Sequence, residues 1–332
     1  MSHNCEPWFR AVAMWLKLSC NLRHKWILYE YFAGVSMGKK QPLNPQVTII
    51  GCGTPTPLPD RFGSSYVVQV GDEKLLFDCG PATTWKLARA GISTTEIDNV
   101  FFTHHHFDHD ADFPTFILTR WDQMVPRDRL LNVYGPRLTE EFTNGIIDED
   151  TGLFAHDWQA RVNHPASQIT FADRGGVLPR SKPEVDPHNM GPGLIKSGGN
   201  WEVTAAPADH VQPYLDSLAY RIDTPDGSVV LTGDTAPCDT VTELARGADV
   251  LMMMCWESHD RMDGNEHSGA SSSILGAAET AAEAQVKQLV MVHIGARLTT
   301  AEMKGPREVE AQQAWNGKLI WGDEMMRVPW PD

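Results

Sequence analysis

The feature that most constrains this chain is a cluster of metal-binding side chains directly after a short apolar run. Residues 100–103 read Val-Phe-Phe-Thr, a β-branched and aromatic run that predicts a buried strand. The pattern H-x-H-x-D-H follows, formed by His104, His106, Asp108 and His109. In extended backbone, His104 and His106 lie on one side of the chain and can bind one ion. Asp108 and His109, past the bend, can reach a second ion, at a strand end where α/β folds place their chemistry.

Ligand-type side chains also stand at the ends of strands in the second half of the chain. Apolar runs predict strands that end just before four such residues: His210, Asp234, Glu257 and His293. One tetrahedral zinc site needs only four ligands, so this number of candidates predicts a site for two ions. The seven predicted ligands form two sets with one carboxylate between them: His104, His106 and His210 for one ion, Asp108, His109 and His293 for the other, and Asp234 bridging both.

The predicted ligand set favours hydrolytic chemistry. Nitrogen-rich ligands with two carboxylates and no thiolate suit Zn²⁺, with Mn²⁺ or Fe as alternatives. Two ions about 3.5–4 Å apart lower the pKa of a shared water, so we expect a bridging hydroxide to attack an ester. Asp108 can also orient that hydroxide.

Two residues outside the ligand set are candidates for acid catalysis. His267, just before a predicted alanine-rich helix, is expected to protonate the leaving group. Glu257 is the carboxylate expected to orient the imidazole of His267. His259 is the alternative acid, because it lies closer to Glu257 in the sequence. The other interpretation gives His267 and Glu257 surface positions with no part in the reaction.

The composition is that of a globular protein with an acidic surface. The 332 residues include 28 basic and 43 acidic side chains, a net charge of −15. A surface with this charge repels polyanions, and the sequence contains no run of basic residues. We therefore expect a small-molecule ester substrate rather than a nucleic acid. The expected assembly is a homodimer.

The sequence predicts one main domain, residues 46–332, after an N-terminal extension of different composition. Residues 1–45 mix aromatic and basic side chains, and three interpretations are open. The extension is an amphipathic helix packed on the domain or on a partner subunit, an overextended start with Met37 as the true first residue, or a membrane-surface segment. Its apolar run at residues 11–16 is too short to span a bilayer, so no transmembrane segment is predicted.

Within the main domain, residues 147–200 have little periodicity and are rich in Gly, Pro and Asp. We predict that they form a lid-like insertion and one wall of the substrate site. The six cysteines are scattered without a C-x-x-C pair and are expected to be reduced. Reduced thiols favour a cytoplasmic location and leave a secreted or periplasmic one open.

Over residues 46–300, the motifs and their order resemble those of the metallo-β-lactamase fold superfamily of metal-dependent hydrolases. Asp78, before Cys79 and Gly80, matches a further motif of that family, alongside the H-x-H-x-D-H cluster and the later ligands. The resemblance implies an α/β fold of the α+β type. It is a four-layer αββα sandwich with the metals at one edge between the sheets.

Within that superfamily the chain is most similar to the ribonuclease Z and aryl-sulfatase-like branch. The similarity is carried by residues 51–55 (GCGTP), 75–80 (LLFDCG) and 293–297 (HIGAR). The resemblance to ribonuclease Z also implies an acid relay at Glu257 and His267, where the surrounding motifs match imperfectly. The basic arm that grips tRNA in that family is not seen, since residues 149–196 carry no net positive charge.

The function predicted from the sequence is that of a dinuclear zinc hydrolase acting on a phosphodiester, a sulfate ester or a related small-molecule ester. The first alternative is a tRNA 3′-processing endoribonuclease of the ribonuclease Z type. The same site would also suit lactone or carboxylic-ester hydrolysis. An alternative from a different class is a non-catalytic metal-binding or assembly protein.

Overall fold

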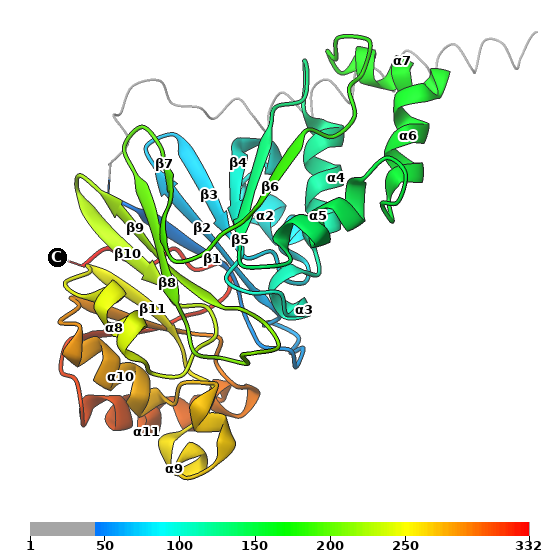
Figure 1. Cartoon of the computed structure of the whole chain (residues 1–332). Coiled ribbons are helices and arrows are strands. Elements are labelled where there is room, and N and C mark those ends of the chain that lie inside the picture. The colour runs from blue at the N-terminus through cyan, green and yellow to red at the C-terminus, as the bar shows by residue number, and fades with distance from the viewer. Residues whose placement is uncertain (1–43, 332) are drawn as a thin grey trace, which may run out of the picture. The chain divides into compact units, whose positions relative to one another are not determined.

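Two β-sheets lie face to face in the computed structural model, which describes residues 44–331 (Figure 1). The first sheet has the strand order β1-β2-β3-β4-β5-β6. Its strands are β1 (Gln46–Cys52), β2 (Ser64–Val70), β3 (Glu73–Phe77), β4 (Ile97–Phe101), β5 (Leu131–Gly135) and β6 (Val185–Asn189). The first three strands pair antiparallel, and β3 to β6 run parallel to one another.

The second sheet has the strand order β13-β12-β11-β10-β9-β8-β7. Its strands are β7 (Gly193–Ser197), β8 (Glu202–Pro207), β9 (Leu218–Thr224), β10 (Gly227–Leu231), β11 (Val250–Met254), β12 (Gln288–Val292) and β13 (Lys318–Trp321). The strands β10 to β13 are parallel. Their carboxyl ends therefore share one edge of the sheet, where Asp234, Glu257 and His293 follow.

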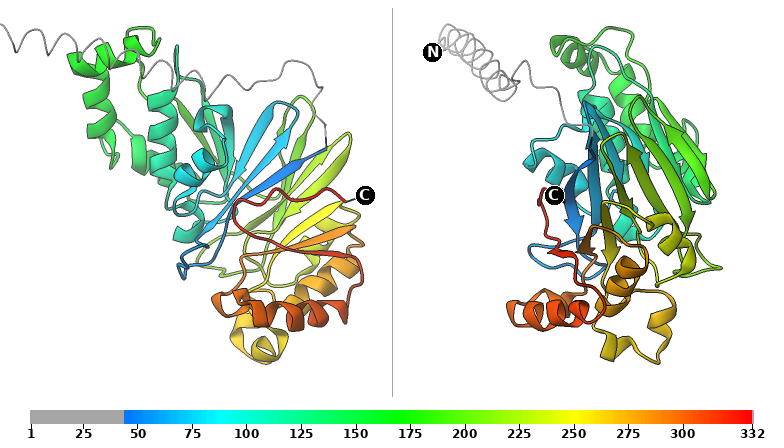
Figure 2. Two further views of the ribbon diagram at one scale, coloured as in Figure 1. Left: turned by 180° about the vertical axis from the view of Figure 1, so that it is seen from behind. Right: turned by 90° about the vertical axis from the view of Figure 1, so that its left-hand side faces the viewer.

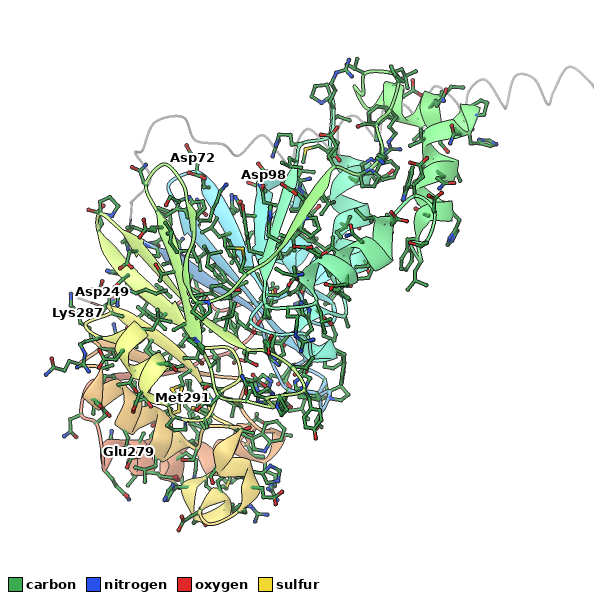
Figure 3. All side chains as sticks on the ribbon, in the orientation of Figure 1. Asp72, Asp98, Asp249, Glu279, Lys287 and Met291 are labelled. Atoms are coloured by element: carbon green, nitrogen blue, oxygen red, sulfur yellow. The ribbon has the colours of Figure 1, made fainter. Side chains whose placement is uncertain are left out.

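The main core lies between the two sheets, where side chains fill the space (Figure 3). In β2, Val68 belongs to this inner core, whereas its neighbour Val67 packs with the helices outside the first sheet. In β11, Met252 is likewise inner and Leu251 outer. Because successive side chains of a strand point to opposite faces, both faces of each sheet are apolar and must be covered.

Helices cover the outer face of each sheet (Figure 2). The first sheet is covered by α2 (Thr83–Arg89), α4 (Phe113–Gln123) and α5 (Thr139–Ile147), and the second by α8 (Asp239–Ala245), α10 (Ile274–Glu283) and α11 (Ala301–Gln312). Short helical turns complete the connections: η1 (Thr94–Glu96), α3 (Phe107–Asp110), α9 (His259–Met262), η2 (Glu266–Gly269) and η3 (Ala296–Thr299). The predicted four-layer αββα sandwich is confirmed.

The insertion at residues 147–200 is more regular than its sequence predicted. It contains two helices, α6 (Ala155–Asn163) and α7 (Pro165–Asp173), which lie beside α4 (Figure 1). It also contributes β6 to the first sheet and β7 to the second. The helices show little periodicity because α6 buries only Ala155 and Trp158, and α7 buries only Phe171. The role of the insertion as a substrate wall stays a prediction.

No helix within residues 44–331 is long and apolar enough to cross a membrane. The interpretations of residues 1–45, including Met37 as the first residue, concern a stretch that lies almost wholly outside the described residues. The domain bounds, the homodimer and the cytoplasmic location also stay predictions.

Candidate metal centre

The loop that carries the H-x-H-x-D-H pattern is fixed by the end of the first sheet. Phe102, just after β4, is fully buried, and its backbone N–H donates to the carbonyl of Tyr134 in β5. The backbone is still extended at His106, which is the N-cap of α3. The chain then turns into the helix, where Asp108 and His109 are buried. Strand, cap and one helical turn thus bring the four side chains to one place.

The first predicted ligand set lies together in the structure. Nε2 of His104 is 3.0 Å from Nδ1 of His106, and Nε2 of His210 is 3.2 Å from that same nitrogen. The ligand atoms of the three residues all lie within 4.8 Å of one another. Nδ1 of His210 is 2.6 Å from the carbonyl oxygen of Ala270 and donates to it. That bond fixes the ring and leaves Nε2 available to an ion.

The second predicted set also lies together. Nε2 of His293 is 3.1 Å from Oδ2 of Asp108, and Nε2 of His109 is 3.6 Å from that oxygen. Their ligand atoms likewise lie within 4.8 Å of one another. His293 has a φ of 47°, in the left-handed region that residues with a side chain rarely adopt. Strained backbone of this kind is found at functional sites.

Asp234 lies between the two sets. Its Oδ1 is 3.3 Å from Nε2 of His109, while its Oδ2 is 3.3 Å from Nε2 of His293 and 3.9 Å from Nε2 of His210. Gly233 directly before it has a φ of 60°, and a Cβ there would lie 2.6 Å from Cβ of Thr103. A glycine is therefore needed for the loop after β10 to approach the loop after β4.

A metal ion fits these residues better than hydrogen bonds among them do. Nε2 of His109 and Oδ1 of Asp234 are buried, and although they lie 3.3 Å apart they form no hydrogen bond with each other or with another described residue. A buried polar atom without a partner costs about 1–3 kcal/mol, and a bound cation would remove that cost. The donors are imidazole nitrogens and carboxylate oxygens, which suit Zn²⁺. None of the four cysteines in the described residues belongs to either set.

Burial and neighbouring charges prepare the ligands for a cation. Burial, with the positive charge of His109 nearby, holds the pKa of His104 well below its usual value, so this imidazole is neutral. Burial alone would raise the pKa of Asp234, but the positive charges of His293 and His109 have the larger effect and hold this pKa well below its usual value. Burial lowers the pKa of His109, but Asp234 and Asp78 outweigh it and the pKa lies well above normal. A metal must therefore displace a proton from His109, and metal binding weakens as the pH falls.

Asp78, which follows β3, holds the loop of the H-x-H-x-D-H pattern by hydrogen bonds. Its Oδ2 accepts hydrogen bonds from Nδ1 of His109 at 2.8 Å and from Oγ1 of Thr103 at 2.9 Å. Its Oδ1 accepts from the backbone N–H of Thr103 at 2.8 Å. The sequence motif identified Asp78, but these contacts could not be read from it. His105, inside the cluster, instead contacts Asp110 and Thr139.

Glu257, the predicted orienting acid, is paired with arginines. It is buried, and its Oε2 accepts a hydrogen bond from Nε of Arg297 at 2.9 Å. A second nitrogen of Arg297 also contacts that oxygen, and Nε of Arg261 lies 3.6 Å away. Sequence reasoning missed Arg297 as this partner, because 40 residues separate it from Glu257.

His267 lies on the exposed turn η2, and no hydrogen bond or ion pair joins it to Glu257 within residues 44–331. The same turn leads to Ala270, whose carbonyl holds His210. The segment that carries His267 therefore borders the metal centre, although the predicted pair is not formed. His259 lies 3.5 Å from the hydroxyl of Ser273. The catalytic roles of His267 and Glu257 stay predictions.

A family model described as the beta-lactamase superfamily domain matches residues 73–294, a span that contains all seven predicted ligands. The chain belongs to the β-lactamase superfamily. The family and its ribonuclease relatives indicate a hydrolase of phosphodiester or other ester bonds, and the His and Asp clusters are groups that could hold a metal ion.

A sequence relative narrows the family assignment, and solved structures share the fold. Ribonuclease Z of Mycobacterium avium (strain 104) is 30% identical over 291 residues, which cover 85% of this chain and 97% of that protein. The metallo-β-lactamase fold protein YhfI from Bacillus subtilis matches with a TM-score of 0.65 and 21% identity, covering 86% of this chain and 98% of its own. The short form of human tRNase Z has a TM-score of 0.62 and 19% identity, covering 86% of this chain and 100% of its own. The predicted fold and the ribonuclease Z branch of the β-lactamase superfamily are confirmed.

The prediction of a small-molecule ester substrate rather than a nucleic acid is wrong. A relative that is 30% identical and spans most of the chain is named ribonuclease Z, an enzyme that acts on RNA. The error came from the net charge of −15, which is a sum over the whole chain. A sum does not say where basic side chains gather, and contacts with a polyanion depend on local charge.

Proposed function

We propose that this protein is an endoribonuclease of the ribonuclease Z type, which hydrolyses a phosphodiester bond at the 3′ end of a precursor tRNA. The names of the relatives support an RNA substrate. The geometry supports the chemistry, and one observation carries it: Asp234 lies between two sets of ligand atoms, each confined within 4.8 Å. An arrangement of this kind suits two metal ions at one phosphate.

The two sets are proposed to hold two Zn²⁺ ions: His104, His106 and His210 one, Asp108, His109 and His293 the other, with Asp234 shared. Bound ions of this kind would polarise a phosphate oxygen and lower the pKa of a water to near neutrality. The rest of the chemistry depends on the side chains of the chain itself.

Asp108 is proposed to orient the attacking water by accepting a hydrogen bond from it. Burial raises the pKa of Asp108, but the hydrogen bond from His293 and the positive charges of His109 and His293 together have the larger effect, so the pKa lies below its usual value. The carboxylate is therefore ionised at neutral pH. Its membership of the ligand cluster supports this role, because the proposal puts the phosphate at that cluster.

His267 is proposed to supply the proton to the leaving oxygen. Its support is its place on the exposed turn whose Ala270 contacts the ligand His210. The oxygen of water forms a bond to phosphorus, the bond between phosphorus and the leaving oxygen breaks, and that oxygen takes the proton of His267. The attacking water releases one proton to the solvent, from which His267 is protonated again. The products are a phosphate monoester and a hydroxyl group.

The test uses the full-length protein loaded with zinc and a precursor tRNA that carries a 3′ trailer. We expect one cut at the junction of tRNA and trailer, loss of that cut after chelation, and recovery when zinc returns. An unstructured RNA of the same length serves as the control for tRNA shape.

Two negative results have different meanings. Hydrolysis of bis(p-nitrophenyl) phosphate without cleavage of any RNA would refute the substrate and keep the metal chemistry. Failure to hydrolyse either compound, at full zinc content, would refute the whole proposal.

A further inference from the structure

A second charged site lies away from the metal centre, where α6 and α7 meet the last turn of α4. It is a hollow of about 240 Å³ whose lining includes Asp122, Arg161, Ser167, Arg174 and Arg180. The helix α4 starts just after the metal loop, and Asp122 lies near its other end. At 1.5 Å per residue the hollow is about 15 Å along the helix from the metal loop.

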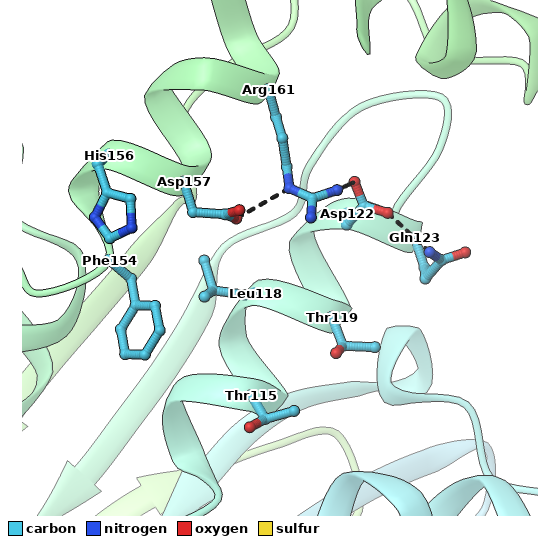
Figure 4. A pocket seen from close by; sticks show the side chains of 9 residues that line it. All are labelled: Thr115, Leu118, Thr119, Asp122, Gln123, Phe154, His156, Asp157 and Arg161. Atoms are coloured by element: carbon cyan, nitrogen blue, oxygen red, sulfur yellow. Dashed lines mark hydrogen bonds and ion pairs between the residues drawn. The ribbon is translucent and has the colours of Figure 1, made fainter.

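Three guanidinium groups in this hollow surround one carboxylate. Arg174 contacts both oxygens of Asp122, at 3.0 and 3.4 Å, and Arg161 and Arg180 contact Oδ1 at 3.3 and 3.1 Å. Figure 4 shows that Arg161 also bonds Asp157 on its own helix, at 2.9 Å. Even with Asp157 counted, three positive charges face two negative ones.

Each guanidinium group has N–H donors that are not used in these ion pairs. Nη2 of Arg161, Nε of Arg174 and Nη1 of Arg180 donate to no other residue within 44–331. Ser167, on α7, adds a hydroxyl that likewise makes no hydrogen bond to a described residue. An anion in the hollow could therefore be bound without breaking the existing ion pairs.

One guanidinium group of the hollow, that of Arg180, is held in a fixed position. The guanidinium of Arg180 lies 3.8 Å from the ring centre of Trp121 and 4.6 Å from that of Phe171, and its side chain is 3% exposed. Cation–π contacts and burial fix this group. Burial raises the pKa of Asp122, but hydrogen bonds from Arg174 and Arg180 outweigh it, so this carboxylate is ionised.

We infer that this hollow, which we call the arginine hollow, binds a phosphate group. Three guanidinium groups around one carboxylate repel one another, and a phosphate would relieve that repulsion through charge-assisted hydrogen bonds. A network that only fastened α7 to α4 would need no excess of positive charge in a chain of net charge −15. The identity of the phosphate as part of an RNA backbone rests on the proposed function. An RNA cut at the metal centre would then have a second contact on α6 and α7.

The main test replaces the two partly exposed arginines in the full-length, zinc-loaded protein. The double variant Arg161→Gln, Arg174→Gln is expected to bind the RNA substrate about tenfold more weakly, since it loses one to two phosphate contacts. The slope of log K against log salt should fall by about 1. Hydrolysis of bis(p-nitrophenyl) phosphate should not change, because the metal ligands are untouched.

Two matched variants control for charge and for folding. Arg246→Gln removes an exposed arginine just after α8 that pairs with Glu243, and it should leave RNA binding unchanged. Arg161→Lys, Arg174→Lys keeps both charges and should retain the salt slope. RNA binding and salt slope equal to wild type in the Gln double variant, with RNA cleavage intact, would overturn the inference.

A second measurement separates the arginine hollow from the proposed function. Inorganic phosphate should raise the melting temperature of the wild type but not that of the Gln double variant. If the wild type binds no RNA but shows this difference, the hollow binds free phosphate and the inference stands without the RNA. If phosphate stabilises both proteins equally and RNA is not bound, the inference is wrong.

Discussion

The metal centre and the neighbouring segment 256–269 both follow strand ends, yet their side chains are held in different ways. Five of the seven predicted ligands are buried to within a few per cent, and contacts from Asp78 and Ala270 fix two of the imidazoles. In the segment, Glu257 is held by Arg297, and His267 is exposed, its imidazole making no hydrogen bond or ion pair with any residue of 44–331. Metal ligands must converge before a substrate arrives, whereas a proton donor can reach its geometry only in the complex.

The largest effect is expected for Asp108→Ala, which tests whether the converging side chains form the metal centre. The variant removes a ligand of one proposed ion and the acceptor for the attacking water. We expect RNA cleavage to fall below detection and the zinc content to drop from two equivalents towards one, measured by elemental analysis. Asp226→Ala, at an exposed turn, is the control and should behave as wild type. Full zinc content and normal activity in Asp108→Ala would break the assignment.

The next effect is expected for His267→Ala, which tests whether the exposed segment takes part at all. Loss of a general acid should lower kcat/KM by about 10²–10⁴-fold for phosphodiesters with poor leaving groups. Substrates with good leaving groups should change little, because they need no proton. A plot of rate against leaving-group pKa measures this. His259→Ala is the matched control, and equal losses across all leaving groups would remove His267 as the acid.

A smaller effect is expected for Asp78→Ala, which tests how far the contacts behind the loop stabilise the centre. His109 would lose the partner of its Nδ1, and Thr103 would lose the acceptor of its backbone N–H. Loss of an outer partner of a metal ligand costs about 10–100-fold in metal affinity. Competition with a zinc-binding dye measures that affinity. If affinity is unchanged while the protein stays folded, packing alone positions His109.

The smallest effect on catalysis is expected for Glu257→Gln, which separates the two roles of this acid. If the role of Glu257 is to pair with Arg297, the variant should lose about 1–3 kcal/mol of stability, because a buried carboxylate loses its charge-assisted hydrogen bonds to a largely exposed arginine. Its rates should then fall by the same few-fold factor for good and poor leaving groups. If Glu257 orients His267, the variant should reproduce the leaving-group dependence of His267→Ala. Denaturant unfolding and the leaving-group series distinguish these outcomes, with Glu243→Gln as an exposed control.

The sequence could predict much of the metal centre because its chemistry is concentrated. The spacing of His104, His106, Asp108 and His109 after an apolar run identified a metal loop without any structure. His210, Asp234 and His293 were found because strand ends can be read from periodicity. That all seven converge depends on the sandwich, which the family resemblance supplied.

Other features depend on contacts that a linear pattern does not contain. Glu257 pairs with Arg297, which is 40 residues away in the sequence. Asp78 contacts Thr103 and His109 only because β3 pairs parallel with β4. The helices α6 and α7 bury too few apolar side chains to show a period. The cluster of Arg161, Arg174 and Arg180 could not be read from the sequence, because these residues are dispersed among acids and meet only in the folded insertion.

The ligand sets without sulfur have a consequence for chemical durability. Cys79 stands directly beside Asp78, yet burial raises the pKa of its thiol well above normal, and burial raises the pKa of Cys52 to about 12. Peroxides and alkylating reagents attack thiolates, and these buried groups offer almost none. This hydrolase is therefore expected to retain its ions through oxidative stress that would strip zinc from a cysteine-ligated protein.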